Sequence, residues 1–110
     1  APTVNISPTV ADFGSILNID TGRVYYTITN NGKSPLIIRD VKTACGCTGT
    51  ILQKNVLAPG ESTLIQAEFR ALGRSGDVSK PIYVIVNDPK MPVIELEIKG
   101  KIVYNPNAIE

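Results

Sequence analysis

The 110-residue chain contains no histidine and no tryptophan, one methionine and only two cysteines. Histidine is the usual general base at neutral pH and the commonest metal ligand in proteins. Its absence argues against a hydrolase, and we expect a protein that is not an enzyme. Structural zinc takes four ligands from cysteine, histidine or carboxylate groups, so two cysteines alone do not complete such a site.

Neither the charge nor the hydropathy of the chain points to nucleic acid or to a membrane. The net charge is +1 and the cations are scattered singly, which gives no electrostatic reason to bind nucleic acid or anionic lipid. No apolar run approaches the ~20 residues that a membrane-spanning helix needs. With 43% hydrophobic and 19% charged residues, the composition is that of a globular protein. We expect a single domain over residues 1–110.

Hydrophobic and polar residues alternate in short segments that are separated by turn residues. The clearest alternation runs from Val93 to Tyr104, and the turn dipeptide Asn31–Gly32 separates two further segments. The other expected strands are residues 1–15, 23–30, 35–44, 49–52, 62–70 and 81–87. No segment combines helical periodicity with caps. The pattern predicts an all-β protein, an immunoglobulin-like antiparallel β-sandwich of about seven strands.

Three local expectations follow from prolines, glycines and chain ends. Two prolines within residues 1–15 predict an edge strand, which the pair Phe13–Gly14 should end in a turn. Its expected inward-facing anchors are Val4, Ile6 and Val10. Residues 71–80 should form the longest loop, and residues 105–110 should be a frayed tail.

Both cysteines lie in the tetrapeptide Cys45-Gly46-Cys47-Thr48. Antibody-type domains instead carry distant cysteines that join the two sheets beside a buried tryptophan. Alternate residues of a strand point to one face about 6.6 Å apart, near the upper limit for bridged cysteines of about 6.8 Å between Cα atoms. Gly46 is able to bend and shorten that distance. A local disulfide is therefore one interpretation, and its small loop would add little stability.

Three other interpretations of Cys45 and Cys47 stay open. Both residues pack well as small hydrophobes. As metal ligands they suit copper, since Cu(I) favours thiolates and thioethers, and Met91 is the one thioether in the chain; zinc is the other candidate metal. A nucleophilic thiolate needs a base or a positive neighbour, and Lys42 is the nearest cation in sequence.

Several motifs occur in a fixed order along the chain. They are Phe13–Gly14, Tyr26–Lys33, Pro35–Ile38, Cys45–Thr48, Ala58–Glu61 and Ile98–Gly100. Their order resembles a bacterial family of immunoglobulin-like domains of unknown function, many of them exported, with a Cys-Gly-Cys-Thr signature. At greater distance it is similar to major sperm protein and Hydin-type β-sandwiches. The resemblance covers a core of residues 9–103 and implies the fold and export to the periplasm or the cell exterior.

The resemblance implies no reaction. The eukaryotic relatives act mainly as binding or assembly modules, so we expect the chain to bind a protein partner or to assemble an envelope structure. The start at Ala1 is consistent with a removed signal peptide and also with a cut fragment. The alternative is a metal-binding or thiol-redox protein built on Cys45 and Cys47. Tyr25 and Tyr83 are candidates for a binding patch if they lie close together on the surface.

Overall fold

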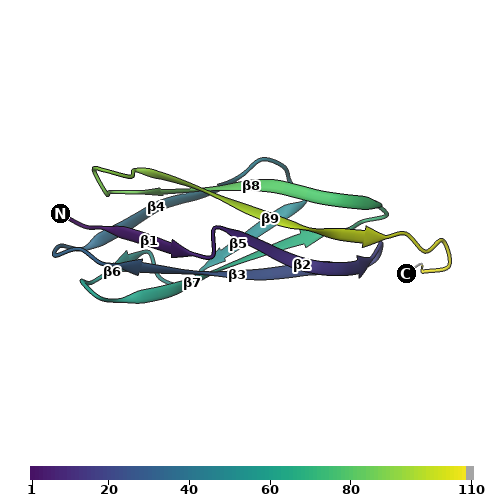
Figure 1. Ribbon diagram of the computed structural model, residues 1–110, viewed down its shortest axis with the longest axis horizontal. Coiled ribbons are helices and arrows are strands. Elements are labelled where there is room, and N and C mark those ends of the chain that lie inside the picture. Colours follow the sequence, from purple (N-terminus) through teal and green to yellow (C-terminus); the bar gives the residue numbers. More distant parts are fainter. Residues whose placement is uncertain (109–110) are drawn as a thin grey trace.

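The computed structural model describes residues 1–108, and within them the chain forms nine β-strands and no helix. The strands are β1 (Val4–Ser7), β2 (Val10–Leu17), β3 (Thr21–Asn30), β4 (Leu36–Thr43), β5 (Thr48–Leu52), β6 (Val56–Leu57), β7 (Ser62–Arg70), β8 (Gly76–Val86) and β9 (Val93–Val103). A four-stranded sheet, in the order β1-β3-β7-β5, packs on a five-stranded sheet, β2-β9-β8-β4-β6 (Figure 1). The expected all-β sandwich is confirmed. In residues 1–108 there is no helix that is long and apolar enough to cross a membrane.

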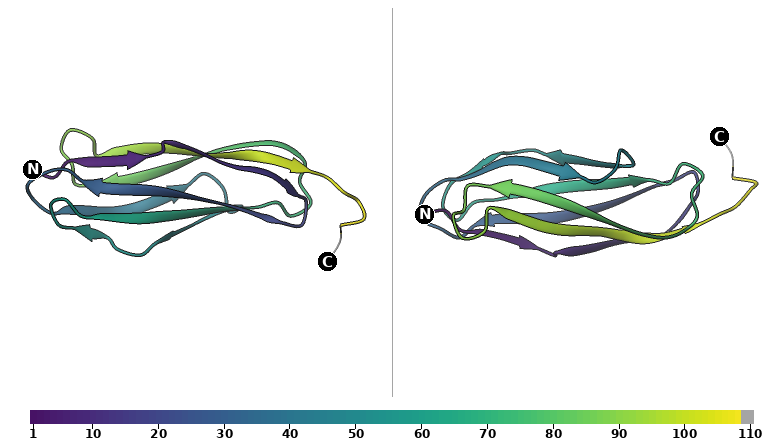
Figure 2. Two further views of the ribbon diagram at one scale, coloured as in Figure 1. Left: turned by 60° about the horizontal axis from the view of Figure 1, so that its bottom comes forward. Right: turned by 90° about the horizontal axis from the view of Figure 1, so that it is seen from above.

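The sandwich is elongated, with extents of 54 × 19 × 19 Å. The N-terminus and the tail after β9 lie at opposite ends of it in every view (Figure 2). The core between the two sheets is mainly aliphatic. Its fully buried large side chains are Tyr26, Ile28, Leu36, Leu57, Ile65, Phe69, Ile82, Val84, Leu96, Ile98 and Ile102. These are alternate residues of their strands, as the sequence pattern predicts.

The first segment divides between the two sheets, which is one reason why there are more strands than the expected seven. β1 pairs antiparallel with β3, whereas β2 pairs parallel with β9. The parallel pair arises because the chain crosses to the other sheet after Ser7 without reversing its direction. Both strands lie at sheet edges, as the prolines predicted. The crossing also shifts the alternation by one residue, so Val4 and Ile6 are buried as expected, but Ala11 is buried in place of Val10.

Phe13–Gly14 forms a bulge within β2 rather than a terminal turn. The register against β9 shifts there, and Gly14 has a φ of 81°. The bulge directs Phe13 between the sheets, where its ring stacks on Phe69 with the ring centroids 6.1 Å apart. Gly22 in one sheet and Gly100 in the other take inward-facing positions, and a Cβ on either would overlap the Phe13 ring. The ring therefore occupies the volume of two missing side chains.

Two expected irregular segments are shorter than the sequence indicated. β8 begins at Gly76, so the loop spans residues 71–75, because residues 76–80 pair with β9 despite their glycine and aspartate. The tail after β9 is attached to the fold over residues 105–108. Asn105 N–H donates to Asn18 Oδ1 (2.8 Å), and Asn18 Nδ2 donates to the carbonyl of Ala108 (3.4 Å). Residues 109–110 of the expected frayed tail lie outside the described residues.

Asn30, the last residue of β3, is fully buried and uses its whole side-chain amide. Its Oδ1 accepts hydrogen bonds from the main-chain N–H groups of Thr3 (3.3 Å) and Gly32 (2.9 Å). Its Nδ2 donates to the carbonyls of Ser34 (2.8 Å) and Leu57 (3.0 Å). Its main-chain groups bond to the turn between β6 and β7. One side chain thereby joins the N-terminal segment, the loop after β3 and β6.

Replacing Asn30 by alanine should be strongly destabilising. We expect Asn30→Ala to lower the free energy of unfolding by about 2–4 kcal/mol, because it leaves buried main-chain groups without partners. The matched control is Asn31→Ala, since the neighbouring Asn31 is exposed. Urea unfolding of both variants measures the difference, and equal losses would contradict the role of Asn30.

Tyr26 links the two sheets through its hydroxyl. The buried phenol on β3 donates to the main-chain carbonyl of Glu97 on β9 (2.5 Å). Burial, and then the negative charge of Glu97, raises the pKa of Tyr26 from 10.0 to about 12. Folding thus favours the neutral phenol. The resulting stabilisation is complete below the unfolded pKa of 10.0 and is lost as the pH rises through about 12.

Tyr26→Phe should alter the alkaline limb of the stability profile. We expect a loss of about 1 kcal/mol at neutral pH, from the missing hydrogen bond. Between pH 10.0 and about 12 the variant should lose less further stability than the parent, because it has no phenol to ionise. Urea unfolding as a function of pH measures this, with the exposed Tyr25→Phe as control. A Tyr26→Phe curve parallel to that of the parent throughout the alkaline range would refute the assignment.

Candidate functional site

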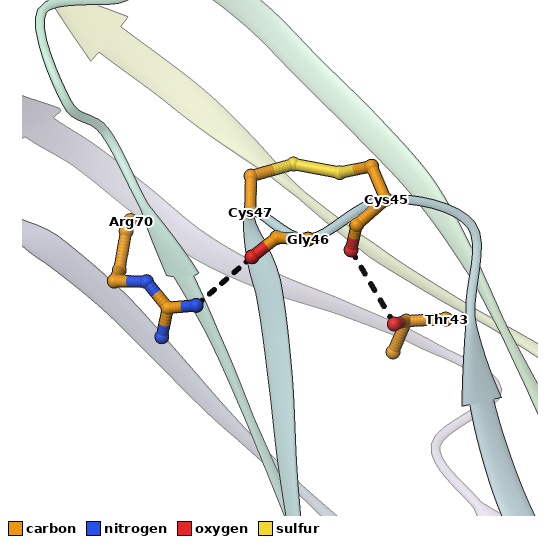
Figure 3. Close-up of a disulfide and its surroundings, with 5 residues drawn as sticks. All are labelled: Thr43, Cys45, Gly46, Cys47 and Arg70. Atoms are coloured by element: carbon orange, nitrogen blue, oxygen red, sulfur yellow. Dashed lines mark hydrogen bonds between the residues drawn. A yellow bond between two sulfur atoms is a disulfide. The ribbon is translucent and has the colours of Figure 1, made fainter.

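Cys45 and Cys47 form a disulfide with their Cα atoms 5.4 Å apart (Figure 3). Of the four interpretations of the motif, the structure contains the local disulfide. Gly46 between the two cysteines is exposed, and no atom outside residues 45–47 lies within 4 Å of the place where its Cβ would be. Cys47 is 6% exposed and Cys45 is half-buried. The bend is therefore open to solvent on the side of Gly46 and Cys45.

The disulfide loop joins β4 of one sheet to β5 of the other, and the flanking strands hold its main chain. Arg70 of β7 donates from Nη2 to the carbonyl of Gly46 (2.9 Å; Figure 3). Its main-chain N–H donates to the carbonyl of Cys47 (3.0 Å). The Thr43 hydroxyl, at the end of β4, donates to the carbonyl of Cys45 (3.4 Å). The first residue of β5 is thus placed by contacts on both sides of the loop.

The structure gives no support to a copper or zinc site at Cys45 and Cys47. Both sulfurs are consumed in the disulfide, which leaves no thiolate for a metal or for nucleophilic attack. Among residues 1–108, no group of three or more histidine, cysteine, aspartate or glutamate residues is placed to hold a metal ion. Met91 lies in the turn after β8, whereas Thr43, just before the loop, pairs with Ile82 in the middle of that strand. The Met91 thioether therefore lies at the opposite end of the β4–β8 pair from the disulfide loop.

Tyr25 and Tyr83 do not form a common binding patch. Tyr25 lies on β3 of the four-stranded sheet and Tyr83 on β8 of the five-stranded sheet. Each alternates with buried neighbours, so each points to the outer face of its own sheet. The two rings are on opposite faces of the sandwich. The sequence predicted their outward direction but not the sheet to which each belongs.

Tyr25 instead lies with Ile51 and Leu64, and we call these three residues the sheet patch. They are exposed by 53%, 51% and 49% of their surface. The register places Tyr25, Gln66 and Ile51 in one row across β3, β7 and β5. Together with Gln53 and Gln66 the patch lines a shallow depression of about 40 Å³. Sequence reasoning missed it because its members come from three strands that become neighbours only in the folded sheet.

A small charged cluster lies in the row beside the sheet patch. Glu68 of β7 forms an ion pair with Arg23 (Nε to Oε2, 3.3 Å) and accepts a hydrogen bond from Arg70 Nη1 (3.4 Å), so two guanidinium groups share one carboxylate. Arg23, Glu68 and Gly49 are paired in one row across β3, β7 and β5. Gly49 has no side chain that could balance the charge of the second arginine. The cluster therefore carries one net positive charge next to the edge of the sheet.

The arrangement of strands is that of immunoglobulin-like and PapD-like sandwiches. Residues 4–102 match the family model described as a protein of unknown function, DUF1573, and the chain belongs to that family. A search among curated proteins gave no match. Together with the solved structures below, the family match confirms the resemblance to a family of unknown function and the β-sandwich fold that it implied.

Three solved structures illustrate the similarity. A protein of unknown function from Porphyromonas gingivalis W83 is 26% identical with a TM-score of 0.80; the match covers 91% of this chain and 46% of that one, so this chain spans about half of its length. A PapD-like domain of human CEP192 is 12% identical with a TM-score of 0.77, covering 93% and 86% of the two chains. WR4, a major sperm protein family member of C. elegans, is 12% identical with a TM-score of 0.57, covering 91% and 97%. The last two show the fold alone, and the similarity to Hydin-type sandwiches stays a prediction.

The disulfide is tested by an intact mass after alkylation in denaturant without reductant. We expect no added alkyl group and a mass two hydrogens below that of the reduced chain, because both sulfurs are bonded to each other. Pretreatment with a reductant should allow two alkyl groups to add. Two groups added without reductant would mean free thiols and would reopen the metal and packing hypotheses.

Proposed function

We propose that this chain is a non-enzymatic, exported module that binds another protein or assembles an envelope structure. The observation that carries the proposal is the sheet patch of Tyr25, Ile51 and Leu64 on the outer face of the four-stranded sheet. Contiguous exposed apolar groups with a polar rim mark interaction sites. Tyrosine is enriched in the buried core of protein–protein interfaces. The glutamines around the patch offer hydrogen bonds without the desolvation cost of a charge.

The titratable groups support a role without catalysis. In the described part of the chain, three groups have clearly displaced pKa values, and structural contacts account for each. The Tyr26 phenol is held between the sheets. The N–H groups of Val4 and then Lys90 lower the pKa of Asp88, and a bond from Lys54, followed by the N–H of Ala58, lowers that of Glu61. Both carboxylates brace turns, unlike the paired acid and base of a catalytic site.

The Cys45–Cys47 disulfide supports the exported location. Disulfides form and persist in the periplasm and outside the cell, whereas cytosolic thiols are kept reduced. A bridge between residues only two apart closes too short a loop to add the ~3 kcal/mol expected of a 15-residue loop. The presence of the bond is therefore better accounted for by an oxidising surrounding than by a gain in stability.

A second candidate function, thiol–disulfide exchange, is favoured by the open bend at Gly46. A thiolate of a partner protein would attack Cys45 Sγ, form a mixed disulfide and release the Cys47 thiolate. A second thiol of the partner would then attack the partner's sulfur in that bond. This would leave the partner oxidised and this chain with two thiols, which another disulfide must reoxidise. Equilibration with glutathione at defined ratios measures the potential, and a bridge that glutathione does not open would exclude this role.

Site-specific photo-crosslinking in the native envelope tests the interaction module. A benzoylphenylalanine at Leu64, within the sheet patch, should give a discrete adduct with another protein. The control is the same residue at Val10, which is 46% exposed on the other sheet. A Leu64 adduct that disappears in the Tyr25→Ser variant supports the proposal. No adduct at Leu64, or the same products at both positions, would overturn it.

A further inference from the structure

β5 differs from the other sheet edges of residues 1–108 in having no protection against strand addition. The flanking residues Pro2 and Pro8 protect β1, the bulge at Phe13–Gly14 interrupts β2, and β6 has two residues. The part of β4 beyond β6 has a register shift at Ile38–Asp40 and the charged residues Arg39, Asp40 and Lys42. Prolines, bulges, charges and short length are the usual means of blocking an edge. β5 is five residues long, with the sequence Thr-Gly-Thr-Ile-Leu and a regular register against β7.

The main-chain N–H and C=O groups of Thr50 and Leu52 point away from β7, toward the open edge of the sheet. Arg70 N–H bonds to the carbonyl of Cys47, which makes these two residues a hydrogen-bonded pair of the ladder. Because such pairs alternate in antiparallel sheets, Gly49 and Ile51 bond to β7, and Thr50 and Leu52 face outward. No other segment of residues 1–108 pairs with this edge. The edge therefore offers two N–H and two C=O groups to an added strand.

Gly49 leaves open a path from this edge to the charged cluster. A Cβ on Gly49 would meet Arg70 Nη1 at 3.5 Å and Glu68 Cγ at 3.6 Å, which are ordinary contacts, so the fold itself does not require a glycine here. A glycine within a strand often marks a place where another chain approaches closely. Since two arginines share Glu68, a carboxylate next to Gly49 would be attracted to Arg70 and would complete the charge balance.

We propose that β5 accepts an extended segment of a partner protein as an additional antiparallel strand. The segment carries an apolar residue opposite Ile51, which extends the sheet patch, and two residues later a carboxylate opposite Gly49, which bonds to Arg70. Main-chain hydrogen bonds to Thr50 and Leu52 supply affinity, and the two outward side chains supply specificity. The inference rests on the proposed function and names how the partner binds.

Charge favours an acidic segment over a second copy of this chain. Two-fold pairing of β5 centred on Thr50 would place Ile51 of one copy opposite Gly49 of the other. No second carboxylate would then lie beside Arg70, and the net positive charge of the cluster would be partly buried by an isoleucine. Such burial is unfavourable for a charged group. A partner strand with glutamate or aspartate at that position removes the mismatch.

Binding of a synthetic peptide tests strand addition. The probe is fluorescein-labelled Ser-Thr-Ile-Thr-Glu-Thr-Ser with an amidated end, in which isoleucine and glutamate have the required spacing. The control peptide has lysine in place of glutamate. We expect fluorescence anisotropy to show at least tenfold tighter binding of the glutamate peptide, and a difference that narrows at high salt. Equal affinities for the two peptides, or no binding of either, would overturn the proposal.

Two variants of the chain locate the binding. Thr50→Pro removes an outward N–H without breaking the β5–β7 ladder, and it should weaken binding at least tenfold. Ile51→Lys adds a charge that blocks the edge, with Val10→Lys as the matched exposed control on the other sheet. Binding that survives both edge variants overturns strand addition. If the Leu64 adduct persists in Thr50→Pro, the interaction module stands while its proposed mode is wrong.

Discussion

The buried amide of Asn30 is the interaction on which one end of the sandwich depends. Its four side-chain hydrogen bonds hold the N-terminal segment, the loop after β3 and β6 in fixed positions. A polar group buried without partners would be costly, so the amide tolerates one arrangement of these segments. At the other end, the Phe13 ring fills the space left by Gly22 and Gly100. Each end is therefore closed by a specific side chain, Asn30 at one end and Phe13 at the other.

The two sides of the sandwich differ more than its ends. On one side the chain passes from β1 to β2 and supplies an edge strand to both sheets. On the other side the Cys45–Cys47 loop makes the passage from β4 to β5. Arg70 holds this loop and also belongs to the charged cluster, so the start of β5, the charge and the sheet patch are fixed relative to one another. In the proposed mode of binding, this open side is where a partner gains hydrogen bonds, apolar contact and a charge at once.

The local alternation of hydrophobic and polar residues made most of the strands predictable. Features that depend on which distant strands pair could not be predicted. The strands around Tyr26, Ile65 and Leu96 were placed correctly because each buries one face. The predicted inward position of Val10 is wrong, because no local signal in the sequence marks the crossing between sheets that shifts the alternation. The site was predictable only at the cysteines, whose spacing allowed a local disulfide. The sheet patch and the open edge depend on which strands are neighbours, and that is a property of the topology.

Amide hydrogen exchange of β5 in the isolated chain, followed by NMR, tests most directly whether this edge is open. We expect an alternating pattern, in which the amides of Gly49 and Ile51 are protected by their bonds to β7 and those of Thr50 and Leu52 exchange rapidly. Protection of Thr50 and Leu52 equal to that of their neighbours would show that the edge is already covered. In that case β5 is not the place where this module receives a partner.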